Sequence, residues 1–206
     1  MPSPTYPLET ERLLLRPALD GDVDALHAIQ RRADITRYLY WSPRSRDEVR
    51  ALVAKRRGLT RFEKEGDVLF LYAVLRDTGV LIGEFSLVWT SLQNRCGEIG
   101  FILHPDHHGR GYATEAGTAL LRIGFESAGL HRIIGRCDGR NVASIRAMEK
   151  LGMRKEGHFR ENECVKGEWT DEVTCAMLAR EWLAKSRTVD PGGSSEMCSV
   201  PTEPRQ

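Results

Sequence analysis

The segment from Leu103 to Glu115 holds the residues best suited to binding a phosphate group. A predicted strand ends near Pro105, Gly109 and Gly111 follow, and a helix is predicted from about Thr114. Glycine lets the backbone approach a ligand closely, and the free N–H groups at a helix N-terminus attract anions. No Gly-Lys-Ser/Thr follows, which excludes a P-loop. The alternative interpretation is a tight connection between strand and helix.

A carboxylate on the preceding strand is a candidate general base. Strand alternation places Glu98, Gly100 and Ile102 on one face, so the carboxylate shares that face with an apolar side chain. Burial there would raise its pKa toward a useful range, and it would act through a water. The alternative is an ion pair on a solvated strand face. By the same alternation Glu84 is the second candidate, and His107 is a weaker one, expected to be a solvated loop side chain.

These residues must be positioned by alternating strands and helices. Three strand-like runs precede the glycine loop, and a hairpin turn at residues 77–79 separates the first two. A capping box at Ser45–Glu48 predicts a helix, and Gly152 predicts the end of another. The predicted strands are Leu13–Leu15, Val68–Arg76, Val80–Thr90, Cys96–Leu103, Arg132–Asp138 and Glu172–Ala179, and the predicted helices are Asp20–Arg32, one from Ser45, Thr114–Ser127 and Val142–Leu151. Hairpin strands early and a βαβ-like run later predict an α/β fold with a mixed sheet, antiparallel first and parallel at the centre.

Length and composition limit the number of domains and the class of protein. The chain has 206 residues, 41% of them hydrophobic and 29% charged, which suits one compact domain. We expect an extension at residues 1–9, a domain at 10–185 and a disordered tail at 186–206, where Pro, Gly, Ser and Glu accumulate. A net charge of +1 argues against a dedicated nucleic-acid binder, and no apolar run reaches the roughly 18 residues of a membrane span. The five cysteines fit no disulfide framework, so a cytoplasmic location with reduced thiols is expected.

Several motifs together resemble the GNAT acetyltransferases. The family's pyrophosphate motif, R/Q-x-x-G-x-G/A, is matched by His108–Ala113, with His108 in place of the usual Arg or Gln. Asn141–Ser144 and Glu149–Met153 resemble the later N-x-x-S…K-L-G-F segment of the family. Thr10–Arg16 and Gly167–Asp171 are similar to the branch that includes the ribosomal-protein acetyltransferases RimJ and RimL.

The resemblance implies a fold, a cosubstrate and a binding site. The fold is a central mixed, mostly antiparallel sheet, splayed where CoA binds and flanked by helices. The cosubstrate is acetyl-CoA, with no metal. Backbone N–H groups of the glycine loop would hold the pyrophosphate, and the strand end would bond the pantetheine arm. Asn141 would contact the arm near its thiol; the alternative is a plain helix N-cap, and both roles can hold at once. The implied cofactor-binding residues are Phe101, Ile102, Leu103, His108, Gly109, Arg110, Gly111, Tyr112, Ala113, Thr114, Asn141 and Ser144.

Acetyl transfer to an amine requires a base, an oxyanion donor and a departing thiolate. Glu98 is the favoured base and a backbone N–H of residues 101–103 the favoured oxyanion donor. Many family members use a tyrosine as the acid where this chain has Met148, so the resemblance favours Ser144, which could instead bond locally to the backbone. An acyl-cysteine route through Cys137 is a minor alternative.

The acceptor is less well defined by the sequence. Three aromatic residues within Ile35–Pro43 could form the wall of a binding cleft or cap the core. The acids in residues 160–163 and 168–171 could attract a cationic amine or belong to a solvated hairpin. A protein N-terminal amine, a small-molecule amine (antibiotic, polyamine or metabolite) and a non-catalytic acyl-CoA-binding module stay open. No nucleic-acid or membrane partner is expected, and the sequence leaves open whether the chain forms a homodimer.

Overall fold

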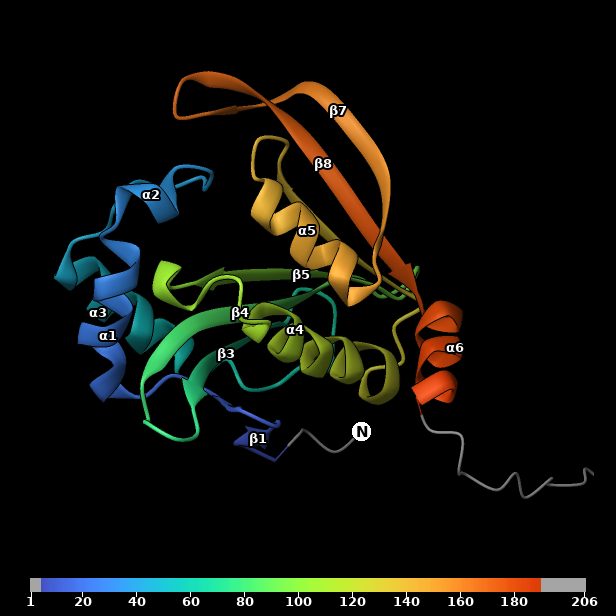
Figure 1. Cartoon of the computed structure of the whole chain (residues 1–206), viewed down its shortest axis with the longest axis horizontal. Coiled ribbons are helices and arrows are strands. Elements are labelled where there is room, and N and C mark those ends of the chain that lie inside the picture. The colour runs from blue at the N-terminus through green and yellow to red at the C-terminus, as the bar shows by residue number, and fades with distance from the viewer. Residues whose placement is uncertain (1–4, 190–206) are drawn as a thin grey trace, which may run out of the picture.

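One eight-stranded sheet forms the centre of the molecule (Figure 1). The computed structural model describes residues 5–189, with side chains described through Lys185. The strand order is β1-β2-β3-β4-β5-β6-β8-β7. The strands are β1 (Leu8–Glu9), β2 (Leu13–Arg16), β3 (Val68–Leu75), β4 (Leu81–Ser91), β5 (Cys96–Leu103), β6 (Arg132–Asp138), β7 (Arg154–Val165) and β8 (Glu168–Leu178).

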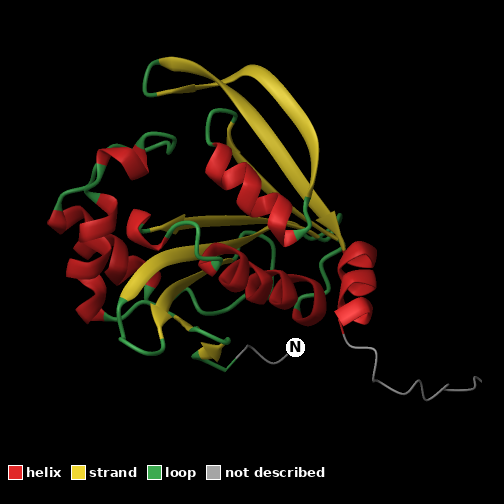
Figure 2. Ribbon diagram, viewed as in Figure 1, coloured by secondary structure: helices red, strands yellow, loops and turns green. Residues whose placement is uncertain are grey.

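Helices cover both faces of this sheet (Figure 2). They are α1 (Val23–Gln30), α2 (Ala33–Thr36), α3 (Arg46–Arg56), α4 (Tyr112–Arg122), α5 (Val142–Leu151) and α6 (Ala179–Val189). Short 3₁₀ turns lie at Asp20–Asp22 and Pro105–His107, and a π-helical turn at Ile123–Ser127 continues α4. In the part of the chain that is described, no helix is both long and apolar enough to cross a membrane.

The two faces bury separate cores. On one face α1 and α3 pack Leu26 and Val49 against Tyr72 and Val74 of β3. On the other face α4 and α5 pack against β4 and β5, in a cluster that includes Phe85, Ile99, Leu120 and Leu151. Burial of these side chains, each worth about 1.5–3 kcal/mol, holds both helix layers to the sheet.

The sheet opens between β5 and β6. These two strands form the parallel pair of the sheet, and the other neighbouring strands pair antiparallel. Pairing between them runs only from Cys96–Arg132 to Glu98–Ile134, whereas β5 continues to Leu103 along β4. The strands therefore diverge beyond Glu98. The predicted mixed sheet with a splay at its centre is confirmed.

Local signals in the sequence placed several elements correctly. Ser45 accepts a hydrogen bond from the Glu48 N–H (3.3 Å), and the Glu48 carboxylate accepts one from the Ser45 N–H (2.7 Å). This capping box begins α3, as predicted. Gly152 ends α5 at φ +89°, a left-handed conformation that glycine adopts without strain.

Other elements differ from the prediction. β7 was not predicted, because nearly all of its side chains are exposed and its sequence lacks apolar alternation. β8 begins at Glu168 rather than Glu172, and α2 and α6 are additional helices. Leu8–Glu9, expected in an extension, pair with β2, and α6 runs past the expected boundary at 185. The rest of the expected tail, 190–206, lies outside the described residues.

Candidate active site

A cleft of about 660 Å³ occupies the splay between β5 and β6. We divide it into two halves by the residues that line it. The glycine-loop half consists of residues 107–114, apart from Arg110, together with Asn141, Ser144 and Met148. The aromatic half consists of Tyr38–Trp41, Arg56, Phe70, Glu84, Arg136, Glu163 and Thr170. The splay thus connects the end of the glycine loop to a chamber on the side of the sheet that α3 covers.

The glycine loop leads into the N-terminus of α4, as the sequence predicted, and its two glycines have positive φ. Gly109 and Gly111 have φ of +74° and +84°, values that side-chain-bearing residues rarely adopt. Gly111 is the N-cap of α4, so the helix begins at Tyr112, two residues earlier than predicted. The imidazole Nε2 of His108 donates a hydrogen bond to the Leu103 carbonyl (2.8 Å). His108 therefore ties the loop back to the end of β5.

The edge of β5 that faces the cleft has backbone groups available for a ligand. His104 N donates to Ile82 O (2.7 Å), which shows that the even-numbered residues at this end of β5 make the hydrogen bonds to β4. Because alternate residues of an antiparallel strand bond to opposite edges, Ile102 bonds β4 while the backbone groups of Phe101 and the N–H of Leu103 are left for a ligand; the Leu103 carbonyl already accepts from His108. An extended ligand could add to this edge like a strand.

The start of α5 places two predicted residues at the cleft. The Asn141 side chain accepts a hydrogen bond from Ser144 N (3.1 Å), so Asn141 is the N-cap that the alternative interpretation described. The Ser144 hydroxyl lines the cleft and, among the described residues, makes no side-chain hydrogen bond. It is therefore available to a ligand rather than bonded to its own helix.

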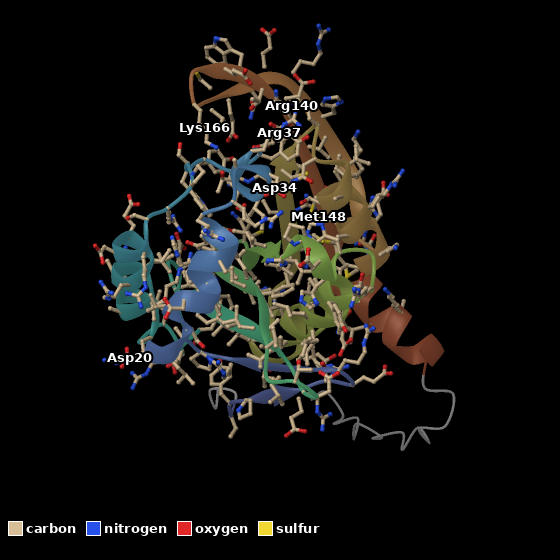
Figure 3. All side chains as sticks on the ribbon, turned by 60° about the vertical axis from the view of Figure 1, so that its left-hand side comes forward. Asp20, Asp34, Arg37, Arg140, Met148 and Lys166 are labelled. Carbon is tan, nitrogen blue, oxygen red and sulfur yellow. The ribbon has the colours of Figure 1, made fainter. Side chains whose placement is uncertain are left out.

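Met148, which occupies the place of the tyrosine found in many family members, points inward from α5 (Figure 3). It is 2% exposed, and a Cβ added at Gly135 of β6 would lie 2.5 Å from its sulfur. The thioether therefore packs on the bare backbone of Gly135. A tyrosine ring at position 148 would need space that this contact does not leave.

The two candidate bases have different access to the cleft. Both oxygens of Glu98 accept hydrogen bonds from Arg136 (3.2 and 3.0 Å), and Arg136 lines the cleft whereas Glu98 does not. Glu84 does line the cleft. Its side chain is 6% exposed and accepts hydrogen bonds from Arg56 (2.5 Å) and from Gln30 (3.1 Å to each oxygen).

Arg136 also forms an ion pair with a second carboxylate, Glu172, which was not among the predicted site residues. Glu172 of β8 is 6% exposed and lies 3.5 Å from an Arg136 nitrogen. The hydrogen bonds that Arg136 donates to Glu98, with a smaller contribution from the charge of Glu172, raise the pKa of Arg136. Strand alternation from Ile134 to Arg136 could have placed this arginine beside Glu98, but its pairing with Glu172 depends on β8, which lies far along the chain.

Cys137 and His107, the two minor candidates for catalysis, have shifted pKa values. Burial raises the pKa of the Cys137 thiol to about 12, so almost no thiolate forms at neutral pH. Burial, reinforced by the charge of Arg110, lowers the pKa of His107. His107 lies edge-on to His104 and Tyr112 and lines the cleft, whereas a solvated loop side chain was expected. In the described part of the chain, no three His, Cys, Asp or Glu side chains are grouped to hold a metal ion.

Two segments that are distant in the sequence contact each other beside the aromatic half. Tyr40, which follows α2, donates a hydrogen bond to Glu163 of β7 (2.6 Å). Lys166, in the turn between β7 and β8, donates to the Thr36 carbonyl (2.6 Å). Figure 3 shows Arg37 and Lys166 gathered where these segments meet.

Comparisons with known proteins agree on the family. Residues 12–154 match the family model described as an acetyltransferase (GNAT) domain. The chain is 34% identical to the uncharacterized N-acetyltransferase YnaD of Bacillus subtilis, over 85% of this chain and 98% of that protein. A crystal structure of a GNAT-family acetyltransferase from Bacillus anthracis superimposes with a TM-score of 0.76 and 31% identity, covering 84% of this chain and 99% of that one.

Two relatives with named substrates are more distant. The chain is 28% identical to the ribosomal protein uS5 alanine N-acetyltransferase of Escherichia coli, over 87% of this chain and 94% of that protein. It is 25% identical to the spermidine N(1)-acetyltransferase of Vibrio cholerae, over 85% and 98%. The matched domain, the splayed sheet and the glycine loop at the start of α4 together identify the chain as a member of the GNAT family of N-acetyltransferases.

Proposed function

We propose that the chain transfers an acetyl group from acetyl-CoA directly to the α-amine of a protein or peptide N-terminus. The observation that carries the proposal is a continuous cleft, which joins an anion-binding loop to an aromatic chamber through the splay of the sheet. Such a cleft allows both substrates to meet without a covalent enzyme intermediate.

The cofactor side of the proposal is supported by the backbone. The N–H groups of residues 109–114, at the positive end of α4, suit a pyrophosphate. The Phe101 carbonyl and the Leu103 N–H on the open edge of β5 suit the amides of the pantetheine arm. A thioester at the end of that arm would then lie near Ser144, where the strands separate.

The chemistry follows from these positions. The neutral amine attacks the thioester carbon, the new C–N bond forms and the C–S bond breaks. The Phe101 N–H stabilises the oxyanion, and the Ser144 hydroxyl donates its proton to the departing sulfur while it takes up the proton that the attacking nitrogen releases as the amide forms. The high pKa of Cys137 argues against an acyl-cysteine route.

For the base, access to the cleft decides between the two carboxylates. Because Glu84 lines the aromatic half and Glu98 meets it only through Arg136, we assign proton removal to Glu84, acting through a water. Glu98 then holds Arg136 in place. This reverses the order that the sequence favoured.

The charges around the aromatic half favour an N-terminal amine over a polyamine. The acids that line it have partners, since Glu84 pairs with Arg56 and Glu163 accepts from Tyr40. Arg37 stacks on the ring of Tyr38, which lines this half, and Lys166 donates to the Thr36 carbonyl; neither contact pairs the positive charge with a carboxylate. A polycation would be repelled here, whereas a peptide N-terminus carries one charge. Similarity to the uS5 alanine N-acetyltransferase supports the same class of acceptor, a protein N-terminal amine.

The test is thiol release from acetyl-CoA with a matched panel of acceptors. Peptides with a free N-terminal Ala or Ser should be acetylated, and the same peptides with a blocked N-terminus and an internal lysine should not. Spermidine and an aminoglycoside complete the panel. Turnover confined to these small amines would overturn the acceptor assignment, and CoA binding without turnover on any acceptor would favour a binding module.

A further inference from the structure

The segment that precedes β2 is bonded to the first turn of α4, about a hundred residues further along the chain. Glu115 receives hydrogen bonds on its Oε1 from the Thr10 hydroxyl (2.6 Å) and the Arg12 N–H (2.7 Å). Its Oε2 accepts from the Arg12 guanidinium at 2.7 Å. Both oxygens of this carboxylate, which is 13% exposed, are thus held by two residues of one segment.

Arg12 also contacts the glycine loop itself. Its Nη1 donates a hydrogen bond to the Arg110 carbonyl (2.9 Å), and its guanidinium lies 4.5 Å from the centre of the Tyr112 ring. A Cβ added at Gly111 would lie 3.3 Å from its Nη2. One side chain therefore touches three consecutive residues of the loop.

The bond to the Arg110 carbonyl fixes the direction of the next N–H. In a trans peptide the C=O and the following N–H point in opposite directions. Because the Arg110 oxygen points at Arg12, the Gly111 N–H points away from Arg12, and Gly111 is one of the residues that line the cleft. Arg12 thereby orients an N–H of the loop before any anion arrives.

Arg12 and Thr10 also neutralise a charge that would oppose anion binding. Glu115 lies in the first turn of α4, next to the N–H groups that would receive the pyrophosphate. A bare carboxylate there would repel a second anion. Burial alone would raise its pKa, but the hydrogen bonds from Thr10 and Arg12 outweigh that effect and lower the pKa. The carboxylate is thus anionic and fully paired.

We propose that Arg12 is a positioning residue for acetyl-CoA, which orients the pyrophosphate-binding backbone and compensates Glu115. This inference rests on the proposed use of acetyl-CoA at the glycine loop. It assigns a functional role to Thr10 and Arg12, which otherwise serve only to anchor the first strands.

The experiment compares two acetyl donors, acetyl-CoA and S-acetylpantetheine, which lacks the pyrophosphate. Arg12→Gln should lower kcat/KM for acetyl-CoA by about tenfold to a hundredfold, the range for one hydrogen bond to a charged group, through KM with kcat nearly unchanged. The kcat/KM for S-acetylpantetheine should change less than about twofold. Arg12→Lys should show a smaller loss than Arg12→Gln. The double variant Arg12→Gln/Glu115→Gln should also lose less kcat/KM for acetyl-CoA than Arg12→Gln alone, because the bare carboxylate is gone.

The controls separate this role from folding and from the proposed function. Arg46→Gln removes an exposed ion pair with Asp24 on the opposite side of the molecule and should leave both donors unaffected. CoA affinity is measured by calorimetry for every variant. Equal losses with both donors, or unchanged CoA affinity in Arg12→Gln, would overturn the positioning role. Failure of the unaltered chain to bind CoA would overturn the proposed function, and the inference with it.

Discussion

Glu84 and Arg56 form the most deeply buried ion pair in the cleft wall, so replacing one partner should be costly. Their side chains are 6% and 11% exposed. Removing one member of a buried pair costs about 3–5 kcal/mol, because the other charge stays behind without compensation. In Glu84→Gln the amide oxygen still accepts a hydrogen bond and Arg56 still lies over Phe70 at 3.9 Å, so we expect about 2–4 kcal/mol. For a chain of this size that lowers Tm by roughly 5–15 °C.

The assay is urea unfolding followed by tryptophan fluorescence, applied as a double-mutant cycle with Arg56→Met. The double variant should unfold with a free energy within about 1 kcal/mol of the unaltered chain, giving a coupling energy of about 2 kcal/mol or more. Glu98→Gln is the matched comparison, because its pair with Arg136 is 24% and 41% exposed and should contribute no more than about 1 kcal/mol. Effects of Glu84→Gln and Arg56→Met that add within about 0.5 kcal/mol would refute the reasoning.

The same variants test the base. If Glu84 takes the proton, the double variant Arg56→Met/Glu84→Gln should be folded and bind CoA yet lose most of its kcat. Glu98→Gln should keep most of its kcat. The reverse result would return the role to Glu98.

Four further predictions concern individual residues. Ser144→Ala should lower kcat about tenfold to a hundredfold with little change in CoA affinity, and Ser144→Thr, which keeps a hydroxyl, should retain most activity; equal loss in both would exclude a proton-donor role. Cys137→Ser should keep its kcat and show no acetylated cysteine by mass spectrometry, because burial raises the thiol pKa to about 12. Met148→Tyr should lower stability by about 1–3 kcal/mol, since the ring must displace the contact with Gly135, and should not raise activity. The folded chain lowers the pKa of Glu115, so the stabilising contribution of its carboxylate is present above about pH 4.3 and is lost as the pH falls through the lowered pKa. Between about pH 5 and 3, the Tm of Glu115→Gln should therefore fall less than the Tm of the unaltered chain.

Features encoded by short segments were predictable from the sequence. Gly109 and Gly111 have the left-handed φ values expected of a ligand-binding loop, and Gly111 begins α4. The capping box at Ser45 and the glycine end of α5 are equally local. Each depends on the conformational preference of one or two residues, which neighbouring residues in the sequence already fix.

The polar hairpin shows where such reasoning fails. β7 is an exposed edge strand whose side chains carry almost no apolar alternation, and its backbone pairing with β8 holds it in place. Its role in the cleft, through Glu163 and Tyr40, depends on the position of residues that lie far away in the sequence.

In the candidate site, too, local features were predictable and long-range contacts were not. The sequence by itself determined the family, the loop that suits a pyrophosphate, and the set of residues from which catalytic groups are drawn. Only the tertiary structure decided their roles, because these depend on partners from distant segments. Gln30 and Arg56 hold Glu84 in the cleft wall, Arg136 pairs with Glu98 outside the cleft lining, and Arg12 reaches the loop from about a hundred residues earlier in the chain. Backbone conformation is set within a few residues, whereas access and charge compensation depend on which side chains the fold brings together.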